Sequence, residues 1–420
     1  MRIFIDCTHT ANNTYKNTGI HRVVRQITAE LIQISESNSN LEIIPVRFDG
    51  KFITRVDSLY EAVSNFSPKG KNLYSYIHRA KNKLKKLFLD YLSINNQGKY
   101  KSEFVGIKFS SSDVYLIADA NWDLPNSYYH FLQHLRDHKV SIASICYDLI
   151  PIKFPEFCPK EFVKSFRDFY CQYSDCFDQV ICISNKSAED YIKAKQDGVL
   201  PNNNKSQTVN NFRLGSDYSK DQKRYINNDV IDDSNFLSLL NQRYILVVGS
   251  LVPHKNIKTI ITAFDLLTES NNNIHLVFAG NRGWHNDADL LIEKNKMYGN
   301  LIHILDSVTD SQLDILYKNC YCLVQASFYE GFGLPVVEAL QHNKPVISSN
   351  GGSLPEVGED FCMYFDPTQP AQLYQALEKL LASDNFYNQL VTRIQNEYRP
   401  FSWKESAKQL LSVISIHQSY

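Results

Sequence analysis

The sequence predicts an α/β protein of two domains that face each other across a cleft, each built on a doubly wound parallel sheet. Short apolar runs bounded by turn residues alternate with stretches of helical periodicity, and this alternation is typical of repeated βα units. The alternation occurs twice along the chain. The length of 420 residues also favours two domains, at about 150 residues for each.

Residues 1–215 are predicted to form the first Rossmann-like domain, which a long connection near 52–110 interrupts. Its helices are expected to include 20–34 and 160–173. Its expected strands are 3–6, 43–48, 114–118, 141–146, 179–184 and 209–212.

The interrupting connection contains bases beside apolar residues at helical spacing. Leu84, Leu87, Phe88 and Leu92 recur next to a basic stretch. Two interpretations stay open: an amphipathic helix near 78–92 lying on an anionic membrane surface, or a helix packed on its own domain with a solvated basic face. No run reaches 18 apolar residues, so we expect a cytoplasmic protein with at most peripheral contact at the inner face of the membrane.

Residues 216–240 are predicted to be a linker, because polar residues there displace the apolar periodicity. A second Rossmann-like domain is expected over 241–400, with helices starting at Asn256, Asp310 and Pro335. A terminal helix within 401–420 should pack back on the first domain. The expected strands of the second domain are 244–248, 274–279, 301–304, 321–324 and 345–348.

Composition argues against nucleic acid and metal as partners. The net charge is -1, from 44 basic and 45 acidic residues, so no global field attracts a polyanion. Nine cysteines without paired spacing indicate reduced thiols. Neither close pair, Cys171 with Cys176 or Cys320 with Cys322, has the further ligands that zinc needs.

The segment 330–338, with the sequence E-G-F-G-L-P-V-V-E, follows a predicted strand and opens a helix. Gly331 and Gly333 allow backbone N–H groups to approach a ligand, and Pro335 suits the first helical position. Glu330 and Glu338 can accept hydroxyl groups at different depths of one cleft. A phosphate flanked by a sugar and a ribose fits this spacing, which predicts a nucleotide sugar as the ligand.

This segment resembles the glutamate-spaced donor motif of glycosyltransferase family 4, which are retaining enzymes of the GT-B fold. The segment 247–256, with the sequence V-V-G-S-L-V-P-H-K-N, is similar to the family's first donor-domain loop. Segments 345–348, 354–357 and 401–403 also resemble family positions. In the first half, 18–20 resembles the glycine loop before the first helix, and 178–187 a strand that ends in serine.

The resemblance implies roles for individual residues. Glu330 would bind hydroxyls of the donor sugar, Glu338 the ribose, and Lys255 the leaving diphosphate, whose developing charge a fixed cation stabilises. The other donor-binding positions that it implies are Gly19, Gly249, Ser250 and the backbone N–H groups of Phe332, Gly333 and Leu334.

Two positions depart from the family pattern. Ser250 stands where many relatives have arginine, so the second diphosphate charge is expected from His254 or Arg282. Tyr147 stands where a histidine is usual, and two interpretations stay open: a catalytic residue that reaches the donor sugar, or an aromatic side chain that shapes the cleft. The neighbouring Asp148 is the better polar candidate for catalysis.

The pair Asp287 and Asp289 fits the D-x-D pattern of metal-dependent glycosyltransferases. Acids at the start of a helix are favoured by its dipole without a metal, and the resemblance implies metal-independent catalysis with no cofactor besides the donor.

Together these observations predict a retaining hexosyltransferase that uses a nucleoside-diphosphate sugar, with mannose and a GDP-sugar favoured over a UDP-sugar. The expected acceptor is a saccharide or a lipid-linked saccharide of bacterial surface polysaccharide or lipopolysaccharide synthesis. Two alternatives stay open: a nucleotide-sugar epimerase of the same fold, and a catalytically silent subunit that binds nucleotide sugars in an assembly complex.

Overall fold

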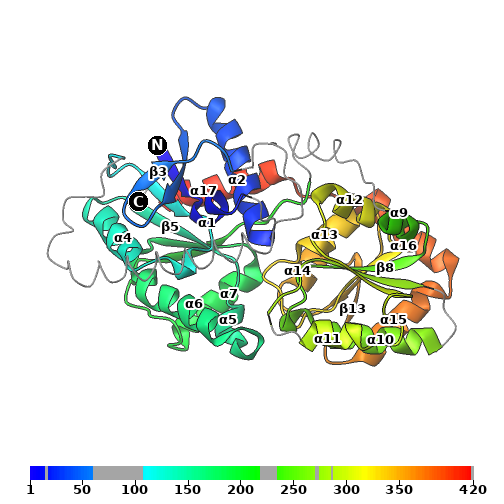
Figure 1. The fold of residues 1–420 in the computed structure, drawn as a ribbon. Helices are drawn as coiled ribbons and strands as arrows, with labels where there is room; N and C mark the ends of the chain where they lie inside the picture. The colour runs from blue at the N-terminus through cyan, green and yellow to red at the C-terminus, as the bar shows by residue number, and fades with distance from the viewer. Residues whose placement is uncertain (15–17, 60–106, 218–233, 270–273, 285–286, 418–420) are drawn as a thin grey trace.

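The computed structural model describes residues 1–14, 18–59, 107–217, 234–269, 274–284 and 287–417. Two sheets lie side by side, each covered by helices (Figure 1). The structure confirms the predicted α/β class with two Rossmann-like domains.

The first sheet has the strand order β3-β2-β1-β4-β5-β6-β7. Its neighbours are parallel except β3, which runs antiparallel to β2 and pairs Arg55 with Val46. We did not predict β3, because three residues with one buried side chain give no periodicity. The strands are β1 (Arg2–Asp6), β2 (Glu42–Phe48), β3 (Ile53–Arg55), β4 (Val114–Ile117), β5 (Ser141–Cys146), β6 (Gln179–Cys182) and β7 (Thr208–Asn211).

The second sheet is parallel throughout, in the order β10-β9-β8-β11-β12-β13. The unpredicted strand β13 is a partly exposed edge strand, which hides it from an apolar pattern. The strands are β8 (Tyr244–Val248), β9 (His275–Ala279), β10 (Ile302–Leu305), β11 (Cys322–Gln325), β12 (Val346–Ser349) and β13 (Cys362–Phe365).

Helices cover both sheets through apolar side chains at helical spacing. In α2, Val23, Ile27 and Leu31 join β1 in one core, while in α10 Ile257, Ile260 and Phe264 pack on the second sheet. The first domain has α1 (Thr8–Asn12), α2 (Gly19–Glu36), α4 (Ser127–Asp137), α5 (Ile150–Lys153), α6 (Lys160–Tyr173) and α7 (Asn185–Gln196). The second has α9 (Ser234–Leu240), α10 (Ile257–Glu269), α11 (Asp287–Glu293), α12 (Asp310–Asn319), α13 (Leu334–Gln341), α14 (Leu354–Gly358), α15 (Pro370–Leu381) and α16 (Asp384–Glu397).

The last helix, α17 (Trp403–His417), returns to the first domain and lies beside α2 (Figure 1). Trp403, Ala407, Leu410 and Ile414 bury one face of α17 in the first-domain core. A β-carbon at Gly215 would lie 2.4 Å from the backbone nitrogen of Trp403, so this return requires glycine there.

Residues at the ends of the predicted insertion and of the predicted linker pack within the two domains. Phe109 packs on Phe4, with ring centroids 4.7 Å apart, so the end of the 52–110 segment belongs to the first domain, as β3 does at its start. Residues 60–106, with the predicted basic helix, and 218–233 of the linker lie outside the described residues. Phe236 and Leu239 of α9 pack in the second-domain core. None of the helices in the described ranges is both long and apolar enough to cross a membrane.

Candidate active site

In open α/β sheets, ligands bind beyond the carboxyl ends of the strands, where the strand order reverses. In the second sheet this point lies between β8 and β11. The loop after β8 leads through a short 3₁₀ turn (Pro253–Lys255) to Lys255, and the loop after β11 leads to Glu330. The topology therefore brings together two residues that are 75 positions apart in the sequence.

Lys255 and Glu330 form a mostly buried ion pair. The Lys255 Nζ lies 2.6 Å from Glu330 Oε1, and the two side chains are 17% and 12% exposed. The same oxygen accepts hydrogen bonds from Ser327 Oγ (2.6 Å) and Gln325 Nε2 (2.8 Å). Burial acts to raise the pKa of Glu330, but the Lys255 charge and the hydrogen bonds from Lys255 and Ser327 help to outweigh it, and that pKa is lowered. Glu330 is therefore held as a carboxylate.

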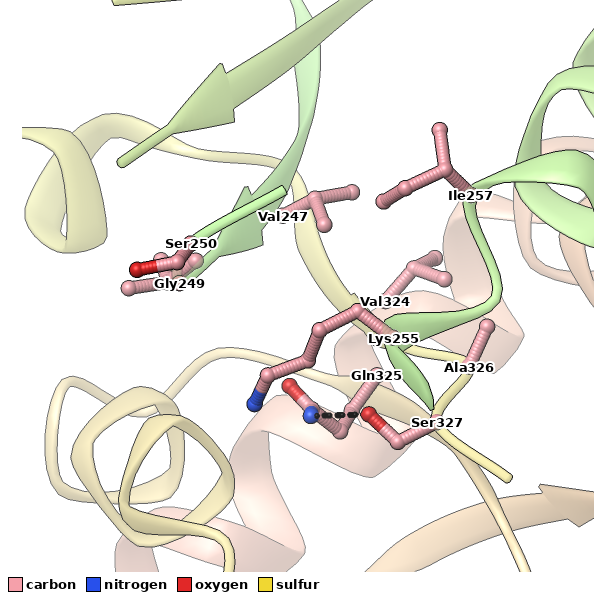
Figure 2. Close-up of a pocket in the computed structure, with 10 residues that line it drawn as sticks. Val247, Gly249, Ser250, Lys255, Ile257, Val324, Gln325, Ala326 and Ser327 are labelled. Atoms are coloured by element: carbon pink, nitrogen blue, oxygen red, sulfur yellow. Dashed lines mark hydrogen bonds between the residues drawn. The ribbon is translucent and has the colours of Figure 1, made fainter. Parts of the chain in front are cut away.

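A small cavity is lined by Lys255, and Figure 2 shows the Lys255 ammonium beside Gln325, which is hydrogen-bonded to Ser327. Gly249 and Ser250 line its other side. Its volume of about 10 Å³ holds roughly one water molecule. A sugar cannot enter it, so a donor would bind over the pair and the loops.

Asn256 fixes the direction of the chain just after Lys255. It adopts a left-handed conformation, with φ of 57°, and its buried amide donates to the carbonyl oxygens of Ala326 (3.1 Å) and Pro367 (2.7 Å). Asparagine tolerates this conformation better than most residues. The turn thereby ties the lysine loop to the segment that carries Glu330.

Neither of the two expected sources of a second diphosphate charge is well placed. Burial, and then the Lys255 charge, lower the pKa of His254 to about 4, so its imidazole is neutral near pH 7. Arg282 is 41% exposed and lies 2.6 Å from Glu293, 3.5 Å from Asp306 and 3.8 Å from Asp289. Its charge is already balanced by carboxylates at the surface.

The D-x-D pair is described only in part, since the side chain of Asp287 lies outside the described residues. Asp289 faces Arg282.

The glycine loop is compressed from both sides. A β-carbon at Gly331 would lie 2.2 Å from the carbonyl oxygen of Tyr147 in the first domain, and one at Gly352 would lie 2.4 Å from the carbonyl oxygen of Glu330. Ser353 donates to that same Glu330 oxygen from its backbone nitrogen and its hydroxyl, both at 3.0 Å. The turn at 351–353 therefore supports the backbone of Glu330, a role that its sequence did not indicate.

Helix α13 begins after Gly333, whose φ of 102° is one that glycine adopts readily. Within the described ranges, the backbone N–H groups of Phe332, Gly333 and Leu334 have no acceptor, as is usual at a helix start. The Phe332 side chain is buried in the first-domain core. The loop thus anchors to one domain with its side chain and leaves its backbone donors available.

Glu338 lies deeper than we expected, at 2% exposure. Its Oε2 accepts from the Tyr317 hydroxyl (2.8 Å), and its Oε1 lies 2.6 Å from Arg22 of the first domain. Burial raises the pKa of Glu338, although the Arg22 charge opposes this. Glu338, which is predicted to bind the ribose, therefore also forms an ion pair with a residue of the other domain.

Asp148 faces this site from the first domain, in the loop between β5 and α5. Its Oδ1 accepts from the backbone nitrogen of Ile150 (2.8 Å). Burial raises the pKa of Asp148 to about 6, and the nearby Glu330 charge adds to that increase. This carboxyl group is poised to change protonation near neutral pH.

Tyr147 does not present its hydroxyl to the cleft. The side chain is 4% exposed, and its hydroxyl donates to the carbonyl oxygen of Ala118 (2.6 Å) inside the first domain. This burial favours the interpretation of an aromatic side chain over that of a catalytic hydroxyl. Its role in shaping the cleft stays a prediction.

Both neighbours of Glu330 are fastened to the first domain. Gly331 accepts hydrogen bonds at its carbonyl oxygen from Ser184 Oγ (2.7 Å) and Ser187 Oγ (3.2 Å). On the other side, the Tyr329 hydroxyl donates to Asp190, which also binds Lys153 Nζ at 2.6 Å. The position of Glu330 therefore depends on how the two domains meet.

A second clamp joins α7 to α14. The Glu356 carboxylate accepts from the backbone nitrogens of Asn185 (2.8 Å) and Lys186 (3.1 Å) at the start of α7. A carboxylate is favoured at a helix N-terminus by the helix dipole. The sequence analysis noted segment 178–187 only for its resemblance to a strand that ends in serine, so these contacts between domains were missed.

Gly19 lies at the start of α2, where a β-carbon would meet no atom within 4 Å. Thr18, directly before it, is described, whereas residues 15–17 lie outside the described residues. Its predicted role in donor binding stays a prediction.

Comparison with known proteins shows which proteins the chain resembles. Residues 231–397 match the family described as glycosyl transferases group 1. The serotype-specific mannosyltransferase WbdA of Escherichia coli is 25% identical over 423 residues, which cover 99% of this chain and 46% of that protein. The O-antigen chain mannosyltransferase B of Escherichia coli is 33% identical over 177 residues, which cover 42% of this chain and 46% of that protein. The matched region covers less than half the length of each of these two relatives.

Solved structures support the fold along the whole chain. A sucrose-phosphate synthase from Thermosynechococcus elongatus aligns with a TM-score of 0.62 at 14% identity, covering 100% of this chain and 99% of that one. Anabaena Alr3699/HepE in complex with UDP and glucose aligns with a TM-score of 0.61 at 13% identity, covering 99% and 100%. With its donor-motif residues, its two sheets and these matches, the chain has the two Rossmann-like domains of the GT-B fold, and its residues 231–397 match the glycosyl transferases group 1 family.

Proposed function

We propose that this chain is a retaining glycosyltransferase that moves a hexose from a nucleoside-diphosphate sugar to a saccharide or lipid-linked acceptor. The observation that carries the proposal is the buried pair of Lys255 and Glu330 at the switch point of the second sheet, opposite Asp148. A fixed cation beside a fixed carboxylate complements a ligand that has phosphate and hydroxyl groups next to each other.

In this proposal Lys255 serves both partners. Its ammonium has three N–H donors, so it can keep Glu330 while it binds a phosphate oxygen of the donor. When the bond between the sugar carbon and the phosphate oxygen breaks, the electron pair stays on that oxygen. Lys255 stabilises this charge most where water is excluded, and it lies in such a place.

Glu330 and Asp148 are proposed to hold the sugar from two sides. Glu330 is a carboxylate whose Oε1 is occupied by protein donors, and its Oε2 would accept a sugar hydroxyl. Asp148, ionised above about pH 6, would accept a hydroxyl from the first-domain side. The acceptor oxygen would attack from the face that the diphosphate leaves and pass its proton to the departing phosphate oxygen, which retains the configuration.

The relatives support the finer assignment. Both relatives described above are named as mannosyltransferases, one serotype-specific and one of the O-antigen chain, which favours mannose and a bacterial surface polysaccharide. We favour GDP-mannose as the donor, although the Anabaena neighbour of the same fold holds UDP and glucose. A lipid-linked acceptor would place the reaction at the cytoplasmic face of the membrane.

Product analysis tests the proposal. The purified chain is incubated with GDP-mannose or UDP-glucose, with and without a mannose-terminated oligosaccharide, and the products are identified by mass spectrometry and NMR. We expect a longer oligosaccharide with a new α-linkage, formed only when both substrates are present. Free sugar or an epimer formed without an acceptor would show an epimerase instead. Donor binding without any product would indicate a silent binding subunit.

A further inference from the structure

Arg22 reaches from the first domain to the donor side of the second. It lies in the first turn of α2, where its backbone nitrogen donates to Thr18 (3.0 Å). Its guanidinium contacts Glu338, 316 residues away in the sequence, with side chains that are 14% and 3% exposed. A first-domain cation is therefore held against the carboxylate to which we assign the ribose.

The charges around the site make Arg22 stand out. A diphosphate brings at least two negative charges, and Lys255 is shared with Glu330. His254 is neutral near pH 7, and Ser250 is uncharged. Arg282 is balanced at the surface by three carboxylates.

Two first-domain lysines, Lys153 and Lys186, both bind Asp190, which also accepts from Tyr329 of the loop. Arg22 differs from Arg282, Lys153 and Lys186, because its partner Glu338 is itself expected to bind a ligand.

We propose that Arg22 binds the donor diphosphate and that Glu338 is its resting partner. This inference rests on the proposed function. A guanidinium has five N–H donors in a planar fork that matches both carboxylate and phosphate oxygens. Arg22 can therefore keep one contact with Glu338 and give its other donors to a phosphate oxygen, while ribose hydroxyls donate to Glu338.

This arrangement has two physical consequences. The ion pair holds the long Arg22 side chain in place before the donor arrives, so less rotamer freedom is lost on binding. The diphosphate would also join a first-domain cation to the second-domain Lys255. Donor binding would then strengthen the contact between the two domains.

The test compares affinities for a nucleoside, its monophosphate and its diphosphate by calorimetry, in the guanosine and the uridine series. The proteins are the wild type, Arg22→Gln and the matched control Arg213→Gln. Arg213 also pairs with a glutamate of the other domain, Glu359, at 2.9 Å, but the two side chains are 32% and 48% exposed. We expect Arg22→Gln to weaken diphosphate binding about 10- to 100-fold and nucleoside binding less than about threefold. Arg213→Gln should leave the whole series within about threefold of the wild type.

An equal loss of affinity for the nucleoside, the monophosphate and the diphosphate would overturn the inference, since Arg22 would then act only by positioning Glu338. An unchanged diphosphate affinity would overturn it as well. If the wild type bound neither diphosphate, the proposed function itself would fail, and the Arg22 inference with it. If Arg22→Gln fails to fold because Glu338 is left buried and unpaired, the same series is measured for Arg22→Gln/Glu338→Gln against Glu338→Gln.

Discussion

The two facing strand edges are built in different ways. On the second domain, Gln325, Ser327 and Glu330 lie within six residues of each other, and Gln325 and Ser327 hydrogen-bond to the same Glu330 oxygen that pairs with Lys255. On the first domain, the contributing residues are scattered: Arg22 lies in the first turn of α2, Asp148 in the loop after β5, and Ser184 caps α7. A short motif encodes the first kind of site, whereas only folding assembles the second. The difference suggests that the donor chemistry is local and that its geometry depends on the contact between domains.

The largest expected effect comes from the local half of the site. Lys255→Met should lower kcat for transfer about 10²- to 10³-fold, because the leaving charge loses its fixed cation and Glu330 is left buried without a counter-charge. Steady-state kinetics with the preferred donor measures this loss. Lys379→Met, at an exposed lysine of α15 that lies over the Phe386 ring, is the control and should retain wild-type kinetics. A Lys255→Met enzyme with normal kcat would refute the assignment of Lys255.

The next effect tests the contact between domains. Gly331→Ala places a methyl group 2.2 Å from the Tyr147 carbonyl oxygen, so the loop or the domains must shift. We expect kcat/KM to fall about 10- to 100-fold, since displacements of about 1 Å at a reacting centre have costs of that order. Thermal unfolding checks that the variant is folded. Unchanged kcat/KM would show that this close approach is not needed for activity.

A smaller effect should appear in the pH dependence. Asp148 has a pKa of about 6, so if its ionised form is required, kcat should fall below about pH 6 by up to tenfold per pH unit. Asp148→Asn should lower kcat at neutral pH and remove this acid limb. An acid limb that persists unchanged in Asp148→Asn would assign it to another group.

We also expect Asp148 to affect the stability of the fold, with a pH dependence opposite to that of kcat. The pKa of Asp148 is higher in the folded chain than its ordinary value of 3.8, so the folded state binds more protons between about pH 4 and 6. The contribution of Asp148 to stability therefore falls as the pH rises through this window. At pH 8, Asp148→Asn should unfold at a higher temperature than the wild type. A lower unfolding temperature for the variant would contradict burial as the cause of the shift.

The smallest effect separates a helix cap from a contact between domains. Ser184 and Ser383 both cap a helix, accepting from Ser187 and Phe386, but only Ser184 also donates to Gly331. Alanine at either position should destabilise the fold by about 1 kcal/mol. Only Ser184→Ala should also raise KM for the donor, by a few-fold. Equal kinetics in the two variants would reduce Ser184 to a cap.

The sequence predicted the fold class because most strands are buried on both faces and give continuous apolar runs. It failed for β3 and β13, which are short edge strands with few buried side chains. The helices α6 and α12 were predicted from the correct first residue, and α12 has a capping box of Thr309 with Gln312. Caps and periodicity are local, which is why they can be predicted from a single sequence.

The site residues show the same difference between local features, which could be predicted, and contacts that depend on the whole fold. Lys255 and Glu330 were predicted as partners, and the structure brings them to 2.6 Å, while their roles stay proposals. The pairing of Glu338 with Arg22 was not predicted, because nothing near either residue encodes a contact across 316 positions. Tyr147 was ambiguous for a related reason: burial decides whether a tyrosine hydroxyl meets solvent, and burial depends on the whole domain.

The central claim is that the pair of Lys255 and Glu330 forms the binding site of a nucleotide-sugar donor. Thermal unfolding of the wild type and of Lys255→Met, each with GDP-mannose, UDP-glucose or no ligand, tests it most directly, since a ligand that binds only the folded state raises the midpoint. We predict a higher midpoint for the wild type with one of the two donors, GDP-mannose favoured, and a much smaller increase for Lys255→Met. Equal increases in the two proteins, or none in the wild type with either donor, would contradict the claim.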